Sequence, residues 1–325
     1  MRAYDWIRQY VHWTTVVDDK WETRALSILG VKIPVKRTVN LAPILNGVFD
    51  ITRCPPATGK LRKLQLANLK LLRIFAAICE HRGIPYYLCG GTLLGAVRHR
   101  GFIPWDDDLD VSVPGEFRDV VQAALEEELK GTNLRLWGVE DTRLSDATLR
   151  ISHKHFDSIN LDIFYPYCFA TTSQDRERVY KAWAKAHFKY CCDYAEMKPT
   201  ENRASILKFR KEMDEYYASL LPEMVDFFSP SARYMTTELH WGHYRYIPMS
   251  DVLPLSEIEF EGFRFKSPRD PKAYTIGQYG DIYSFPPHFD HHGDEFMRFE
   301  EKDVDAIALD LDELLLKFER KDRPS

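Results

Sequence analysis

Long hydrophobic runs are absent from this sequence. No stretch of about eighteen consecutive apolar residues, the length that a membrane-spanning helix needs, occurs among its 325 residues. The first residues carry Asp5 and Arg8 between aromatic side chains, so they lack the apolar core of a signal peptide. The sequence therefore predicts a cytoplasmic protein.

Cysteine patterns typical of metal or disulfide sites are also absent. None of the six cysteines belongs to a Cys-x-x-Cys pair, and no histidine spacing typical of a zinc site accompanies them. We expect these thiols to be small buried apolar groups in a reducing compartment. They are Cys54, Cys79, Cys89, Cys168, Cys191 and Cys192.

The sequence also lacks a net positive charge and the motifs of acyl-transfer enzymes, and each absence excludes a class of function. The formal net charge is −5, whereas a nucleic-acid enzyme usually presents a basic field to the phosphate backbone. Nucleic acid is therefore not expected as the main partner. The sequence contains neither a Gly-x-Ser-x-Gly elbow nor a Ser-His-Asp order, so acyl-transfer chemistry has no support in it.

Acidic residues, by contrast, are concentrated at one place. Asp106, Asp107, Asp108 and Asp110 occupy four of the five consecutive positions 106–110. Carboxylates this close repel one another, and a folded protein tolerates them mainly where a divalent cation or a catalytic task compensates. A solvated acidic turn without a ligand suits Asp106 and Asp107 better than it suits the other two.

Alternation of apolar and polar residues over 108–113 predicts a strand that carries two of these acids. Side chains two residues apart on a strand point to the same face, so Asp108 and Asp110 share one face. Carboxylate oxygens are the ligands that hard cations prefer. The spacing therefore predicts that both carboxylates reach one Mg²⁺ or Mn²⁺ ion or a pair of ions.

A glycine pair precedes the acids. Residues 84–89 are apolar and aromatic and predict a strand, Gly90 and Gly91 end it, and Thr92 can cap a short helix that ends near Gly101. Glycines at the start of a helix let phosphate oxygens approach the backbone N–H groups, where the helix dipole also favours negative charge. The pattern indicates a site for nucleotide phosphates.

The run GGTLLGAVRHRGFIPWDDDLDV over residues 90–111 closely resembles the signature of the LicD family. This family includes bacterial phosphocholine transferases and fukutin-type phosphoribitol transferases. It resembles nucleotidyltransferase folds, in which a glycine turn, an Asp-x-Asp strand and a third acid on a neighbouring strand hold metal and nucleotide phosphates. With distal matches at 260–263 and 279–283, the resemblance covers roughly residues 60–290.

The third acid that the resemblance requires is available at Asp162. Residues 158–164 alternate, with the apolar side chains facing inward and Asp162 facing the opposite way. The segment looks like the family's Ile-Asp-Ile-Phe-Pro motif, although Tyr165 intervenes before Pro166. We therefore expect Asp162 on a strand beside the Asp-x-Asp pair.

Basic residues near these acids are candidates for binding phosphate. Arg98 lies inside the family motif, and its guanidinium group suits a bidentate contact with a phosphate or an aspartate. Arg150 and His153 precede the third-acid strand and can reach the same cleft. A histidine cluster near residue 290 suggests a loop that lines the pocket more than it suggests metal ligands. It consists of His288, His291 and His292.

Together these patterns predict an α+β fold with a nucleotidyltransferase-like mixed sheet, flanking helices and helical insertions. Residues 1–59 form an N-terminal aromatic and strand extension, and residues 60–325 form the LicD-like catalytic domain, with a helical insertion at about 171–225 and a C-terminal helix at about 302–320. Within that domain we also expect a helix over 61–81, a hairpin over 257–265, and a helix that starts after Asp270 and ends at Gly280.

The resemblance implies a Mg²⁺- or Mn²⁺-dependent phosphotransferase. Such an enzyme takes a substituted phosphate, phosphocholine before the alternatives, from a CDP-activated donor such as CDP-choline. It places the group on a sugar hydroxyl of a cell-surface glycan and releases CMP. Phosphoribitol, phosphoethanolamine and glycerol phosphate remain open as transferred groups. Peripheral contact with the inner face of the membrane or with glycan-assembly enzymes also remains open.

In this interpretation each candidate residue has a role. Gly90, Gly91 and Thr92 cradle the donor phosphates together with Arg98 and Arg150. The metal is held by Asp108 and Asp110, and Asp162 completes its shell or deprotonates the acceptor hydroxyl. Two alternatives remain, a nucleotidyltransferase that transfers NMP from an NTP and a non-catalytic nucleotide-binding scaffold. The released products, pyrophosphate or CMP, distinguish the first alternative.

Overall fold

The computed structural model describes most of the chain between residues 11 and 321. The described residues fall into two compact units, one from the ranges 1–54 and 281–290 and the other from 55–280 and 291–325, and each is treated by itself. The described residues are 11–17, 21–28, 31–39, 42–137, 148–170, 208, 211–212, 215, 223–236, 246–285 and 301–321.

The smaller unit contains a three-stranded antiparallel sheet in the order β1-β2-β3. The sequence predicted a strand extension within residues 1–59, and the structure has an antiparallel meander there. Asn46 exchanges two hydrogen bonds with the main chain of Phe285. The elements of this unit are β1 (Val11–Val17), β2 (Trp21–Ile28), β3 (Val31–Val39), α2 (Ala42–Val48) and η1 (Ile51–Arg53).

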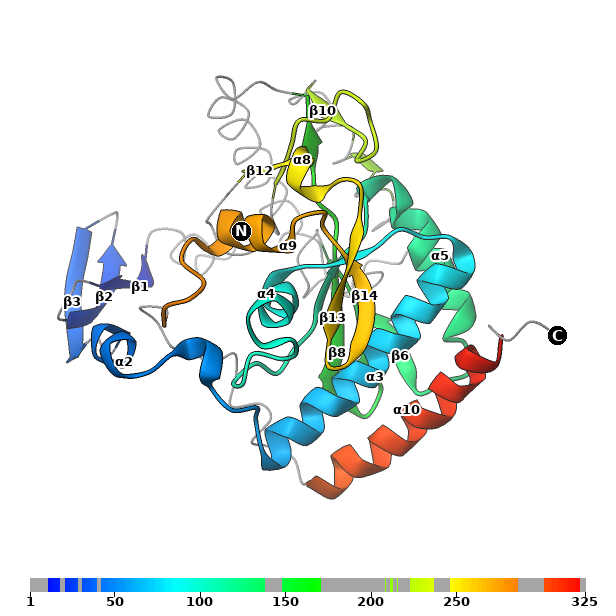
Figure 1. The fold of residues 1–325 in the computed structure, drawn as a ribbon, viewed down its shortest axis with the longest axis horizontal. Coiled ribbons are helices and arrows are strands. Elements are labelled where there is room, and N and C mark those ends of the chain that lie inside the picture. Colours follow the sequence, from blue (N-terminus) through cyan, green and yellow to red (C-terminus); the bar gives the residue numbers. More distant parts are fainter. Residues whose placement is uncertain are drawn as a thin grey trace. The chain divides into compact units, whose positions relative to one another are not determined.

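The larger unit is built on a five-stranded mixed sheet (Figure 1). Its central pair, β5 and β8, is parallel, and every other neighbouring pair is antiparallel. This mixed sheet with helices around it confirms the predicted α+β class. In spatial order the strands are β4 (Tyr87–Leu88), β5 (Asp110–Ser112), β8 (Phe156–Phe164), β7 (Thr148–His153) and β6 (Leu134–Trp137).

The alternating patterns that predicted the two central strands are confirmed by burial. The apolar side chains flanking and within β5 and those on one face of β8 are fully buried. Because these faces are covered, the polar side chains between them turn to the other side of the sheet. The fully buried apolar residues are Leu109, Val111, Val113, Ile159, Leu161 and Ile163.

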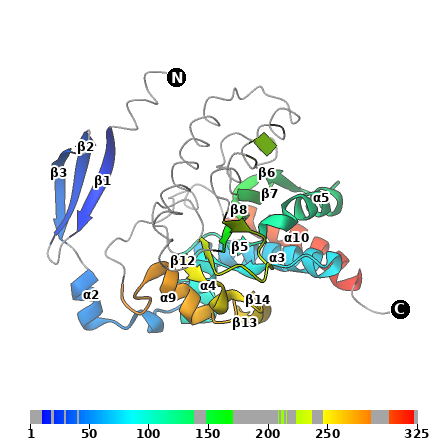
Figure 2. The same cartoon turned by 90° about the horizontal axis from the view of Figure 1, so that it is seen from above.

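Two long helices lie side by side next to this sheet. Helix α3 (Gly59–Arg82) ends at Gly83, which takes the left-handed conformation with φ 64°. Helix α10 (Glu301–Lys321) runs along α3 in both views (Figures 1 and 2), and Lys70 Nζ of α3 is 2.7 Å from Asp312 Oδ2 of α10. Both helices were predicted. The apolar stripe of α10 is buried, namely Val304, Ile307, Leu311, Leu315 and Phe318.

The remaining elements complete the larger unit. The predicted hairpin is formed by β13 (Ser256–Phe260) and β14 (Phe263–Ser267). Asp270 caps α9 (Pro271–Tyr279) by accepting a hydrogen bond from the N–H of Ala273, as expected. The others are α4 (Gly90–His99), η2 (Gly115–Phe117), α5 (Arg118–Glu128), α8 (Met249–Val252) and a sheet of β10 (Met224–Val225), β9 (Cys168–Phe169), β11 (Tyr234–Thr236) and β12 (Tyr246–Pro248).

Several predicted features lie outside the described residues. They are most of the helical insertion at 171–225, the histidine cluster near residue 290, the last two cysteines and the aromatic side chains of the first 42 residues. Of the described cysteines, Cys79, Cys89 and Cys168 are buried, as predicted, and Cys54 is half-buried. No helix in the described part of the chain is both long and apolar enough to span a membrane.

Candidate active site

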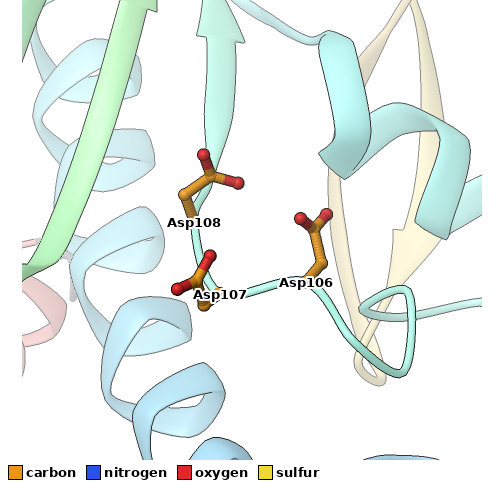
Figure 3. A group of neighbouring side chains, drawn as sticks. All are labelled: Asp106, Asp107 and Asp108. Atoms are coloured by element: carbon orange, nitrogen blue, oxygen red, sulfur yellow. The ribbon is translucent and has the colours of Figure 1, made fainter. Parts of the chain in front are cut away.

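Three consecutive carboxylates converge on the loop that leads into β5. Asp106, Asp107 and Asp108 each place one carboxylate oxygen within 4.8 Å of the other two. Figure 3 shows the three side chains, with the carboxylates of Asp106 and Asp108 pointing to the same side of the loop. Because β5 begins only at Asp110, residues 106–108 are free of the strand alternation that the sequence predicted for Asp108. The sequence favoured a solvated turn for Asp106 and Asp107, whereas the structure places both carboxylates beside that of Asp108, in a group that could hold a cation.

Asp110, the fourth acid, lies against the start of α4. Its Oδ2 accepts a hydrogen bond from the N–H of Gly91 at 3.0 Å, and its own N–H donates to Thr92 Oγ1 at 2.8 Å. The expectation that Thr92 caps this helix is wrong. Helix α4 begins at Gly90, its N-cap is Cys89, and the Thr92 hydroxyl is used to hold β5 instead.

The glycine pair is required by the close approach of two carboxylates. Gly90 has a left-handed φ of 51°, and a Cβ atom there would lie 2.2 Å from Asp110 Oδ2. A Cβ atom at Gly91 would lie 2.8 Å from Asp106 Oδ2. Any larger residue would displace one of these acids. The Gly91 N–H is bonded to Asp110 here, and the predicted phosphate cradle at these glycines stays a prediction.

Asp162 and Arg150 stand beside Asp110 in one row across the sheet. Asp110 on β5 is the register partner of Asp162 on β8, which in turn is the partner of Arg150 on β7. Arg150 forms a bidentate ion pair with Asp162. Its Nε donates to Oδ1 at 2.5 Å and its Nη2 donates to Oδ2 at 2.6 Å. The structure thus brings together the predicted third acid and the predicted phosphate-binding arginine, and it pairs them with each other.

The charges in this row affect one another. Burial by itself would lower the pKa of Arg150, but the hydrogen bonds from its guanidinium to Asp162 and the charges of Asp162, Asp108 and Asp110 outweigh burial and raise that pKa. Burial, and after it the carboxylates of Asp108 and Asp107, raises the pKa of Asp106 well above its ordinary value. A cation bound among these acids would relieve their mutual repulsion.

The other basic residues predicted from the sequence divide between two places. Arg98 at the end of α4 lies near Asp106, where its positive charge opposes, but does not cancel, the rise in the pKa of that carboxyl. Its guanidinium carbon is 6.0 Å from the centre of the Trp105 ring. His153 lies away from the acids. Its Nε2 is 3.3 Å from Asp310 Oδ2 on α10, beside a hollow of about 370 Å³ lined by residues of β7, β8 and α10. The expectation that His153 reaches the cleft of the acids is therefore wrong.

Sequence reasoning missed two amide side chains on α3 that bind the main chain of the acid loop. Gln65 and Asn68 on α3 are fully buried. Gln65 Nε2 donates to the main-chain oxygen of Asp106 at 2.8 Å, and Asn68 Nδ2 donates to that of Asp107 at 2.8 Å. The available signal was two amides spaced i, i+3 on the apolar face of a helix otherwise rich in leucine.

A partly buried ion pair holds the other end of the same loop. Arg62 donates to both carboxylate oxygens of Glu261, at 2.9 and 2.6 Å, and the N–H of Phe102 donates to Glu261 Oε1 at 3.1 Å. Glu261 sits in the turn of the β13–β14 hairpin with a φ of 51° and fills the space beside Gly101, where a Cβ atom would lie 2.4 Å from Glu261 Oε1. Burial alone would raise the pKa of Glu261, but the hydrogen bonds from Arg62 and Phe102 hold it below its ordinary value.

The donor set fits a hard divalent cation. The three converging groups are all carboxylates, and oxygen ligands of this kind suit Mg²⁺ and Mn²⁺ better than softer metals. Asn160 lies on the same face of β8 as Asp162. Its Oδ1 is buried and has no hydrogen-bond partner in the described part of the chain.

Comparison with known proteins gives partial matches. The family described as "LicD/FKTN/FKRP, nucleotidyltransferase domain" matches residues 83–206. The lipopolysaccharide cholinephosphotransferase LicD of Haemophilus influenzae is 61% identical over 51 residues, which are 16% of this chain and 19% of that protein. An uncharacterized protein of Rickettsia prowazekii is 43% identical over 54 residues, which are 17% of this chain and 20% of that protein.

A human protein is also similar over a short segment. The human ribitol 5-phosphate transferase FKRP is 46% identical over 41 residues, which are 13% of this chain and 8% of that protein. The matches therefore span a fifth or less of the length of these curated relatives.

Proposed function

We propose, on the premise that this chain carries a LicD-type nucleotidyltransferase domain, that it transfers a substituted phosphate from a CDP-activated donor to a sugar hydroxyl of a cell-surface glycan. Phosphocholine is the first candidate for the transferred group. The proposal rests above all on one observation, the convergence of Asp106, Asp107 and Asp108 directly beside the glycine turn of α4.

Two further findings support a transferase. The names of two relatives, a cholinephosphotransferase and a ribitol 5-phosphate transferase, both describe transfer of a phosphorylated alcohol. In the reaction proposed for this chain, the negative charge of a donor diphosphate must be neutralised while an alcohol attacks. An excess of carboxylates flanked by Arg98 and Arg150 suits a cation bound together with such a diphosphate.

The proposed metal site combines the loop acids with Asp110. Asp106 and Asp108, which point to the same side, would hold Mg²⁺ or Mn²⁺, with Asp107 and Asp110 adjacent. When bound, the ion supplies charge neutralisation for the diphosphate of the donor. Asp162 was predicted as a third ligand, and its contact with Arg150 would have to loosen for it to serve as one.

The chain's own residues would handle the donor and the proton. Gly90 and Gly91, which here adjoin the carboxylates of Asp110 and Asp106, would cradle phosphate oxygens at the first turn of α4, and Arg98 and Arg150 would bind these oxygens by charge. The acceptor oxygen attacks the phosphorus that bears the alcohol substituent. The bond from that phosphorus to the oxygen it shares with CMP breaks, and CMP leaves with the electron pair. Asp162 takes the proton of the acceptor hydroxyl when it acts as the base.

A second function remains worth testing because the matching family is described as a nucleotidyltransferase domain. Such an enzyme would use the same glycine turn and acids to transfer NMP from an NTP, and it would release pyrophosphate in place of CMP. A non-catalytic nucleotide-binding scaffold would release neither product. The location of the reaction in the cytoplasm also stays a prediction.

The deciding experiment measures products and binding together. Purified protein with Mn²⁺ is given CDP-choline, CDP-ribitol, CDP-glycerol, CDP-ethanolamine or an NTP, and its melting temperature is recorded with each, because a ligand that binds only the native state raises it. We expect one CDP compound to raise the melting temperature and to yield CMP when a glycan acceptor is present. Pyrophosphate from an NTP with no CMP from any CDP compound would favour the second function instead.

Asp162→Asn separates the two roles of that residue. Loss of a general base should lower transfer about 10²–10⁴-fold and leave donor binding with Mn²⁺ unchanged. Loss of a metal ligand should weaken both. Donor affinity and CMP release, measured on the same preparation, distinguish these results.

A further inference from the structure

The amide of Asn68 stands between two strands that would otherwise pair. Asn68 on α3 is fully buried. Its Nδ2 donates to the main-chain oxygen of Asp107 at 2.8 Å, and its Oδ1 accepts from the N–H of Asn160 at 3.1 Å. One side chain therefore joins the acid loop on one side to β8 on the other.

The position of this amide corresponds to a missing step of the β5–β8 ladder. The two strands are parallel, with Val113 N–H bonded to Phe164 O and Asp162 N–H bonded to Leu109 O. Parallel ladders repeat every two residues. The next bond would therefore join Asn160 N–H to Asp107 O, the two groups that Asn68 takes instead.

Interrupting the ladder changes where the acids point. In a regular strand, consecutive side chains point to opposite faces. Three consecutive carboxylates cannot then meet, yet residues 106–108 bring theirs within 4.8 Å of one another. The convergence requires the chain to leave the strand before Asp110, at the point where the Asn68 amide replaces the ladder bond.

A second amide holds the loop on its other side. Gln65, one helical turn before Asn68, donates to the main-chain oxygen of Asp106 at 2.8 Å and to that of Ile103 at 3.3 Å. Both amides are neutral, and both bind main-chain oxygens. They shape the loop without adding charge to a site that already holds four carboxylates.

We propose that Asn68, assisted by Gln65, is a positioning residue that splits the β5–β8 ladder and so creates the convergent carboxylate site for a divalent cation. This inference rests on the proposed function only in placing the cation at residues 106–108. Removal of the Asn68 side chain would let Asp107 O and Asn160 N–H bond directly. The strand would then extend, and the acids would alternate between its faces.

The test compares Mn²⁺ binding in the wild-type chain, Asn68→Ala and Lys70→Met. Lys70 is a matched control because it lies on the same helix, half a turn away, and contacts α10 rather than the acid loop. Mn²⁺ binding is followed by electron paramagnetic resonance, and exchange of the Asn160 amide by NMR. We expect Asn68→Ala to stay folded and to lose Mn²⁺ affinity about 10–100-fold, as is usual for residues that orient metal ligands. Lys70→Met should bind like the wild type.

Several outcomes decide the proposal. Mn²⁺ affinity of Asn68→Ala within twofold of the wild type would overturn it, as would an equal loss in Lys70→Met. If Asn68→Ala does not fold, Gln65→Ala is judged by the same criterion. A wild-type chain that binds Mn²⁺ but releases no CMP from any CDP compound overturns the proposed function alone, and the variants still judge this inference. A wild-type chain that binds no Mn²⁺ overturns both.

Discussion

Helix α3 makes two kinds of polar contact on its two sides. Toward the acid loop it uses Gln65 and Asn68, which are fully buried and bind main-chain oxygens. Toward α10 it uses Lys63 and Lys70, whose ion pairs with Asp305 and Asp312 are partly exposed to solvent. The first kind of contact determines the shape of a loop, whereas the second lies at the edge of an apolar helix–helix contact.

The difference follows from the cost of burial. A buried amide without partners costs free energy, so Gln65 and Asn68 favour the one loop conformation that satisfies them. An exposed ion pair exchanges one set of water contacts for another and contributes only about 0–1 kcal/mol. Substitutions near the acid loop should therefore affect binding and catalysis, and those facing α10 should affect little.

The largest effect should come from the acids themselves. We expect Asp110→Asn to lower CMP release on the order of 10²–10³-fold, the usual loss when an electrostatic group is removed from a reaction centre. The fold should persist, because the main-chain bond from Asp110 to Thr92 is unaffected and an asparagine oxygen can still accept from Gly91. Activity and thermal unfolding are measured together. Activity within tenfold of the wild type would exclude a role for this charge.

The next largest effect should come from Gly90→Ala. The added Cβ would lie 2.2 Å from Asp110 Oδ2, and the left-handed φ adds strain, so we expect a loss of about 1–3 kcal/mol of stability and weaker Mn²⁺ binding. Gly115→Ala is the control, because its nearest neighbour would be Pro166 O at 3.8 Å. Equal effects of the two substitutions in urea unfolding and Mn²⁺ titration would contradict the close contact between Gly90 and Asp110.

A moderate effect is expected for the ion pair at the far end of the loop. Glu261→Gln leaves Arg62 without its charged partner, and we expect a loss of about 2 kcal/mol, less than for a fully buried pair because both side chains retain some exposure. Urea unfolding at pH 7 measures this change. No measurable loss at that pH would show that the pair does not hold the hairpin to the loop.

The stability of Glu261→Gln should also depend on pH differently from that of the wild type. The pKa of Glu261 is lower in the folded chain than its ordinary value of 4.5, so its contribution is present above that value and is lost as the pH falls through the folded pKa. The wild type should therefore lose its advantage over Glu261→Gln in acid. A difference between the two proteins that stays constant from pH 7 down to acid pH would contradict this assignment.

The smallest effect is expected on the α10 side. Lys70→Met removes an ion pair whose carboxylate, Asp312, is nearly half exposed, so we expect a change of at most about 1 kcal/mol and unchanged Mn²⁺ affinity. A loss clearly above this in urea unfolding would mean that the two sides of α3 are energetically alike, and the comparison would fail.

Local pattern was enough to predict much of the structure. The correctly predicted elements all depend on residues that are close together in the chain. They are the alternation around β5 and through 158–164, the long helix that ends before Gly83, the hairpin at Glu261 and the cap at Asp270. Each of these elements follows from side-chain period or from a capping residue, which act over a few positions.

Long-range contacts decided the rest. The role of Thr92 and the place of His153 were predicted wrongly, because their partners, Asp110 and Asp310, come from other elements. The pairing of Arg150 with Asp162 depends on the register of β7 against β8, which no short pattern reveals.

The sequence by itself determined which groups are available at the site. They are a glycine pair, a cluster of four acids, a further aspartate on a neighbouring strand and nearby arginines. Only the tertiary structure decided how the acids point. Asn68 lies 39 residues before Asp107 in the chain, and its amide reaches the loop only because α3 packs against β8. A buried amide must find partners where the fold places it, and here those partners are the groups that would otherwise have extended the strand and separated the acids.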